Sequence, residues 1–245
     1  MNLAKRIRSF FKRRPKVGSA TRIVYALPDV AVYKKFYHRD KFFHDIDWSD
    51  WDTVVNGFEA RFVKWYFEHM LGEHASYIDF CALCALVEVF SHYESDRDWH
   101  EPKNYKEFLR KLDPVFRTKL RSAILITRDE AGAWRPRKLQ DFADVFYTGV
   151  RCSLHHHGDL ASFAGMSGTG QLAIERPDAG SSLCGTYKFN IVVFDPGELK
   201  VRLHQWLHSY CAELRREPNS DKAKIFRKKF FNDFGIKIPN PSETT

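Results

Sequence analysis

Residues 76–94, SYIDFCALCALVEVFSHYE, are the segment that most restricts how this chain can fold. The segment is apolar on nearly every face of a helix, and Ser76 and Asp79 have the spacing of a capping box at its start. A helix with apolar side chains on all sides must be covered by other elements, so we expect it at the centre of the core. Its apolar run is too short to span a membrane, and it includes one acid, Glu88.

Other segments with helical patterns can cover this central helix. The hydrophobic spacing predicts helices over 49–72, 104–112, 113–127, 135–157, 195–216 and 221–235. Gly72 and Gly158 are expected to end two of them.

A Gly- and Ser-rich stretch interrupts the helical pattern between residues 165 and 186. The segments QLAIE (171–175) and YKFNIVVFD (187–195) have the composition of strands and are expected to pair as a hairpin. The sequence therefore predicts a mainly α fold, with a helical domain over 47–238 and a small β-hairpin insertion at about 168–195.

The charge of the chain is concentrated near its beginning. Of the 245 residues, 39 are Lys or Arg and 31 are Asp or Glu, which gives a formal net charge of +8. Residues 1–16 contain seven Lys or Arg residues and no acid, and their apolar residues have helical spacing. We expect residues 1–46 to be a basic, amphipathic extension and residues 239–245 to be a disordered tail. Residues 1–16 of the extension are expected to form a helix that is solvated or that contacts RNA phosphates or a membrane surface.

The cysteines indicate reduced thiols rather than a disulfide framework. Their number is five, and Cys81, Cys84 and Cys211 fall inside apolar helical stretches. Cys81 and Cys84 form a lone C-x-x-C in the middle of a helix, where small thiols are ordinary packing groups and not part of a zinc ribbon. We therefore expect a cytoplasmic protein without a metal or another cofactor.

The segment GVRCSLHHHGD (149–159) places an arginine and three histidines at the end of the predicted helix 135–157. On an ideal helix Arg151 and His155 share a face that points away from the apolar stripe, and His156 lies about 140° from Arg151. An arginine and a histidine suit phosphate chemistry, because a guanidinium binds phosphate oxygens and an imidazole transfers protons near neutral pH.

The motif YTGVRCSLHHHG, with four residues between Arg151 and His156, resembles the R-x4-6-H motif of the HEPN superfamily. The resemblance implies an all-helical fold over residues 50–215 and a metal-independent endoribonuclease that acts as a homodimer. In such an enzyme Arg151 would stabilise the scissile phosphate, His156 would transfer a proton, and Glu88 would orient Arg151. It also implies RNA as substrate and a toxin or phage-defence setting, with an antitoxin or another defence protein as partner.

Three alternatives stay open from the sequence. Helix geometry favours His155 over His156 as the partner of Arg151, whereas the motif spacing favours His156. Glu88 could instead pair with another cation, such as His92 one turn away. Cys152, directly after Arg151, favours an inactive relative that serves as a dimeric interaction or RNA-binding module.

Overall fold

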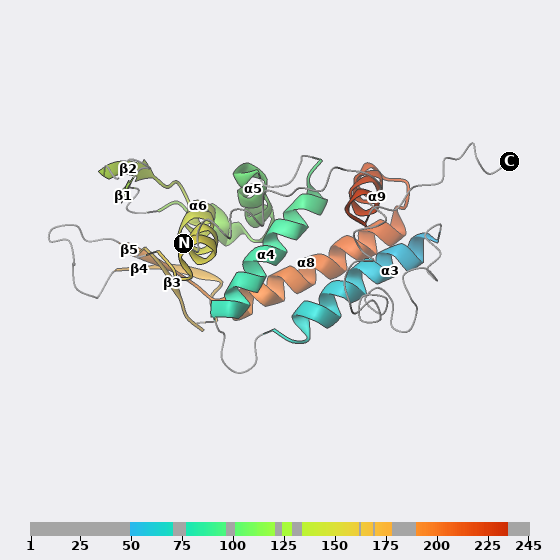
Figure 1. Cartoon of the computed structure of the whole chain (residues 1–245), viewed down its shortest axis with the longest axis horizontal. Helices are drawn as coiled ribbons and strands as arrows, with labels where there is room; N and C mark the ends of the chain where they lie inside the picture. Colours follow the sequence, from blue (N-terminus) through green and yellow to red (C-terminus); the bar gives the residue numbers. More distant parts are fainter. Residues whose placement is uncertain are drawn as a thin grey trace, which may run out of the picture.

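The computed structural model describes residues 50–70, 77–96, 101–120, 124–128, 134–161, 163–168, 170–177 and 190–234. These residues form a mainly helical protein with small sheets at one end (Figure 1). The predicted extension 1–46 and tail 239–245 lie outside the described residues, as do Gly72 and Ser76. The helical elements are α3 (Trp51–Phe62), the π-helical η4 (Val63–Phe67), α4 (Tyr77–Glu94), α5 (Pro102–Leu112), the 3-10 helix η5 (Pro114–Arg117), α6 (Phe142–Val145), the π-helical η6 (Phe146–Cys152), α7 (Ser153–His157), α8 (Pro196–Arg216) and α9 (Asp221–Phe234).

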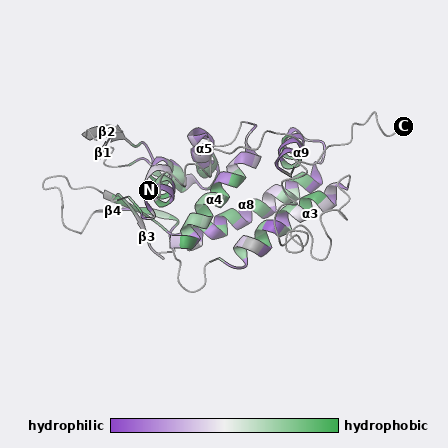
Figure 2. Ribbon diagram, viewed as in Figure 1, coloured by the Kyte–Doolittle hydropathy of each residue, from purple (hydrophilic) through white to green (hydrophobic). Residues whose placement is uncertain are grey.

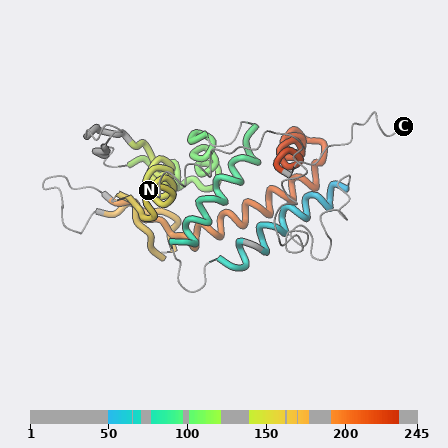
Figure 3. The backbone as a smooth tube through the Cα atoms, viewed as in Figure 1, coloured from blue at the N-terminus to red at the C-terminus, as the bar shows by residue number. Residues whose placement is uncertain are grey.

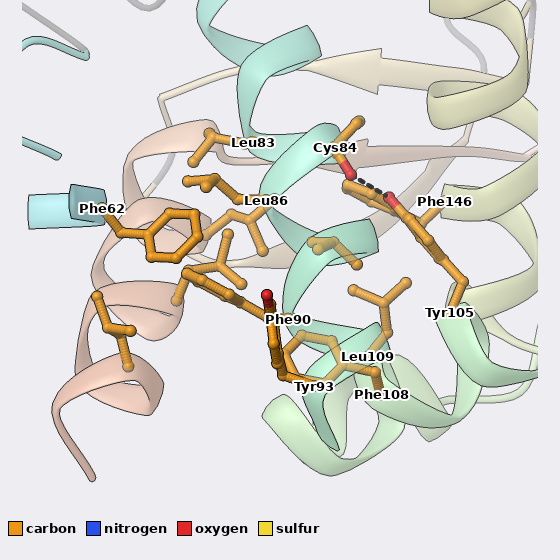
Figure 4. Close-up of a cluster of buried hydrophobic side chains, with 14 of the residues drawn as sticks. Phe62, Leu83, Cys84, Leu86, Phe90, Tyr93, Tyr105, Phe108, Leu109 and Phe146 are labelled. Atoms are coloured by element: carbon orange, nitrogen blue, oxygen red, sulfur yellow. Dashed lines mark hydrogen bonds between the residues drawn. The ribbon is translucent and has the colours of Figure 1, made fainter. Parts of the chain in front are cut away.

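Helix α4 lies at the centre of the core, as its sequence predicts. It contacts α5, α8, α9 and the η6–α7 segment. Figure 2 shows apolar residues along most of α4, whereas α5 and α9 carry many hydrophilic residues. Its inward side chains are covered by other elements, as the close-up in Figure 4 shows; the buried residues include Phe80, Leu83, Leu86, Val87 and Phe90.

Helix α8 joins the two ends of the molecule and contacts both α3 and α4 (Figure 3). Asp195 caps its first turn, because the buried carboxylate accepts hydrogen bonds from the amides of Gly197 and Glu198. The same carboxylate accepts a 2.8 Å hydrogen bond from the amide of Gly170. Asp195 therefore fixes the start of α8 to the loop before the strand that begins at Ala173.

The predicted strand pair is present, and it belongs to a three-stranded sheet. Strands β4 (Ala173–Pro177) and β5 (Asn190–Phe194) are antiparallel. A third strand that the sequence analysis did not anticipate, β3 (Ala164–Met166), pairs with β5 in parallel and gives the order β3-β5-β4.

The prediction of a helix over 113–127 is wrong. Of the described residues in this range, only Pro114–Arg117 are helical, as one 3-10 turn that is capped by Asp113, and Ile124–Arg128 form strand β1. The sequence of β1, ILITR, is rich in β-branched residues, which favour an extended backbone.

The predicted start of the helix 135–157 is also wrong, because Trp134–Lys138 form strand β2, antiparallel to β1. Pro136 has no backbone N–H and would disrupt a helix interior, but a two-stranded ribbon tolerates it at an edge. The helix begins at Phe142 instead, where the side chain of Asp141 accepts a hydrogen bond from the amide of Asp144.

No helix among the described residues is long and apolar enough to cross a membrane.

The contact between Gly149 and the chain that enters β3 allows no additional carbon atom. A Cβ at Gly149 would lie 2.5 Å from Cε2 of Phe163 and 2.9 Å from Cβ of Ala164. We expect Gly149→Ala to lower the free energy of unfolding by about 1–3 kcal/mol, because overpacking forces these groups apart. Urea denaturation followed by circular dichroism measures the change.

Gly168→Ala is the matched control, since a Cβ at Gly168 meets no atom within 4 Å. If the two substitutions lowered the free energy of unfolding equally, close packing at Gly149 would not be the cause of the loss.

Candidate functional site

The candidate site lies on a single irregular helix from Phe142 to His157, which consists of α6, η6 and α7. Gly158 ends this helix as the sequence predicts: its φ is 72°, in the left-handed region that favours glycine, and its amide donates to the carbonyl of Leu154. The residues predicted to form the apolar stripe of this helix are all buried. Leu139 precedes the helix, and Phe142, Ala143, Phe146, Val150 and Leu154 lie on it.

The middle of this helix has π rather than α geometry over the seven residues Phe146–Cys152. A π segment widens the turn, so residues on either side of it are displaced from their positions on an ideal α-helix. The carbonyl of Gly149 accepts a 2.9 Å hydrogen bond from the amide of Ala161, which ties the returning chain to the π segment. Arg151 lies in the last turn of this segment.

Arg151 forms an ion pair with Glu88, the one acid of the apolar core of α4. The distance between Arg151 Nη2 and Glu88 Oε2 is 2.8 Å, and the two side chains are 19% and 16% exposed. The guanidinium also lies 5.6 Å from the centre of the Tyr147 ring, one helical turn earlier. The structure thus brings together Glu88 and Arg151; His92, the alternative partner considered for Glu88, has its Nε2 3.4 Å from Oδ2 of Asp233.

The surroundings of Arg151 keep its guanidinium charged and the neighbouring Tyr147 phenol neutral. Burial lowers the pKa of Arg151, but the hydrogen bond and the charge of Glu88 outweigh burial and raise that pKa above its ordinary value. The pKa of the Tyr147 hydroxyl is raised, first by burial and then by the neighbouring Cys152. The site therefore presents a permanent cation, one carboxylate and an uncharged phenol.

All three histidines of the motif are exposed in the last turn of α7. The pKa of His155 is lowered, by partial burial first and then by the positive charge of Arg151, while Glu88 acts in the opposite direction. The ring of His156 contacts the ring of His157, with 6.4 Å between their centres. His155, the imidazole that helix geometry favours, is therefore electrostatically coupled to the Arg151–Glu88 pair.

Two features of this site were missed in the sequence. The π segment gives no pattern that could be recognised in a single sequence. The contact of Tyr147 with Arg151 could have been found from their i, i+4 spacing.

The described residues include no group of three or more His, Cys, Asp or Glu side chains arranged to hold a metal ion. The chain matches no protein-family model, and comparisons with curated proteins and with solved structures gave no significant match.

The Arg151–Glu88 pair should contribute to stability. Glu88→Gln leaves Arg151 partly buried without its counter-charge, so we expect the free energy of unfolding to fall by about 1–3 kcal/mol. Chemical denaturation at neutral pH measures the loss. Glu107→Gln is the control, because Glu107 forms an exposed pair with Lys103 at 3.9 Å and should change stability by less than about 0.5 kcal/mol.

Removal of the Arg151 charge should raise the pKa of His155. In Arg151→Gln a positive charge that disfavours the imidazolium is absent, and the charge of Glu88, which favours it, remains. A pH titration of the histidine ring signals by NMR measures this shift. Lys224→Gln, which removes an exposed cation paired with Asp221, should leave the His155 titration unchanged; a downward shift in Arg151→Gln would contradict the coupling.

Proposed function

We propose that the chain is a metal-independent endoribonuclease of the HEPN type, in which Arg151, His155 and His156 carry out the reaction. The observation that carries the proposal is the ion pair of Arg151 with Glu88 next to an exposed imidazole, His155. This arrangement combines a fixed phosphate-binding cation with a group that can transfer a proton.

The role of Arg151 in this proposal is to bind the scissile phosphate and stabilise the charge of the transition state. The hydrogen bond to Glu88 uses Nη2, and a guanidinium has further N–H donors for phosphate oxygens. Its contact with Tyr147 limits the orientations that the guanidinium plane can take. Glu88 and Tyr147 are positioning residues, since they would act through Arg151.

The role of the histidines is proton transfer. One imidazole takes the proton of the ribose 2′-hydroxyl while the 2′-oxygen attacks phosphorus and the bond to the 5′-oxygen breaks. A second, protonated imidazole donates to the leaving 5′-oxygen, so the products are a 2′,3′-cyclic phosphate and a 5′-hydroxyl. His155 and His156 are the candidates for these two roles.

The proposal also includes a homodimer. A two-fold axis near the end of α7 would place two copies of this exposed helix end side by side, so that both protomers could line one RNA cleft. The mainly helical fold and the position of Arg151 at the end of a core helix support a HEPN-like bundle. An antitoxin or defence-system partner and a cytoplasmic location belong to the same proposal.

A second candidate is an inactive module of the same kind that binds RNA or another protein. Cys152 favours it, because a thiol stands beside the guanidinium where a stronger hydrogen-bonding group would assist catalysis. In that case Arg151 and the histidines after it would bind RNA without cleaving it.

Cleavage of labelled RNA in the presence of a chelator distinguishes the two candidates. We expect the wild type to cut RNA and to leave cyclic phosphate ends. Arg151→Lys, which keeps the charge but not the planar fork, and His155→Gln or His156→Gln should lower the rate by about 10²–10⁴-fold.

His157→Gln is the control, since it removes an exposed imidazole of the same helix turn and should retain most of the activity. RNA binding without cleavage by the wild type would support the inactive module. Cleavage by Arg151→Lys at the wild-type rate would rule out the catalytic role of this site.

A further inference from the structure

A second pair of histidines lies far along the chain from the candidate site, on α8. His204 and His208 are one helical turn apart, and their Nε2 atoms share a 2.9 Å hydrogen bond. The ring centres are 4.4 Å apart, so the Nε2 edges of both imidazoles lie together. The His208 side chain is 52% exposed, which leaves this position accessible from solvent.

The far side of His208 is held by a carboxylate. Nδ1 of His208 lies 2.5 Å from Oε1 of Glu59 on α3. Since a carboxylate accepts hydrogen bonds, Nδ1 carries the proton in this pair and Nε2 keeps its lone pair when the ring is neutral. A carboxylate behind an imidazole is the arrangement that orients histidines that bind metals.

Neighbouring groups fix this carboxylate and the second imidazole. Arg215 forms an ion pair with Oε2 of Glu59 and donates to Asn56, which leaves Oε1 for His208. The ring of His204 contacts the ring of Phe67, with 4.7 Å between the centres. Phe67 is the last residue of the π-helical segment η4. Both imidazoles are therefore positioned before any ligand is present.

The separation of the two Nε2 atoms indicates which coordination geometry they suit. Metal–imidazole bonds are about 2.0–2.1 Å long, so two nitrogens at the tetrahedral angle are about 3.3 Å apart and two at about 90° are about 2.9 Å apart. The observed 2.9 Å is the length of the hydrogen bond between the two rings, and a metal that took the place of the shared proton at this separation would be bound at about 90°. Adjacent positions at right angles are typical of tetragonal Cu²⁺ and Ni²⁺ sites, and imidazole nitrogens bind Cu²⁺ more strongly than other first-row divalent ions.

We propose that His204 and His208 bind a divalent transition-metal ion of tetragonal preference, Cu²⁺ above all, through their two Nε2 atoms. Glu59 orients His208 from behind, and water completes the coordination, since the described residues supply no third ligand. The site is separate from Arg151 and its histidines, so it does not depend on the ribonuclease proposal.

Titration of the full-length protein with Cu²⁺, followed by EPR spectroscopy and calorimetry, tests the site. We expect one Cu²⁺ per chain with two coordinating nitrogens, and weaker binding of Zn²⁺. His204→Gln and His208→Gln should each lower the Cu²⁺ affinity by at least about tenfold, and Glu59→Gln by about tenfold through the loss of orientation.

His157 belongs to the exposed histidines 155–157 at the candidate site, so His157→Gln is the matched control. This variant should leave the Cu²⁺ affinity unchanged. Circular dichroism confirms that each variant is folded, and the increase in Tm caused by Cu²⁺ should be lost in His204→Gln and His208→Gln. Equal Cu²⁺ binding by these variants and the wild type, or a loss of binding in His157→Gln, would overturn the proposal.

Discussion

The ion pair between Glu88 and Arg151 determines how the site helix is placed against the core. Most of the large apolar side chains of α4 are buried, and Glu88 is itself only 16% exposed. Without a cation beside it, this partly buried carboxylate would cost free energy. Arg151 satisfies this requirement from η6, while the buried stripe of the same helix fills the core. These two constraints together fix the rotation of the helix, and with it the position of His155.

The sequence was sufficient to predict what depends on local patterns. The apolar segment of α4, the buried stripe around Phe146, the helix end at Gly158 and the pairing of β4 with β5 follow from spacing and composition. That Glu88 lies beside Arg151 was an implication of the family resemblance, not of helix periodicity.

What the sequence could not supply depends on contacts between distant segments. Strand β1 was predicted as helix, because its apolar residues fit both periods and only its pairing with β2 decides between them. The π segment η6 was not predicted; it is accompanied by the close approach of Phe163 to Gly149 and by the hydrogen bond from Ala161, both of which join segments that are not on the same helix. Ideal helix geometry nevertheless favours the same imidazole, His155, because the π segment ends one residue after Arg151.

The hydrogen bonds of Asp195 affect how the small sheet and the start of α8 unfold locally. Its single carboxylate receives the amides of Gly197 and Glu198 from α8 and the amide of Gly170 from the loop before β4. If the sheet separates from α8, the buried carboxylate of Asp195 loses the hydrogen bond from Gly170 or those from Gly197 and Glu198. Since this loss costs free energy, we expect the sheet and the first turn of α8 to open together. The backbone amides of the small sheet and of the beginning of α8 should therefore exchange their hydrogens in one cooperative opening rather than in two separate ones.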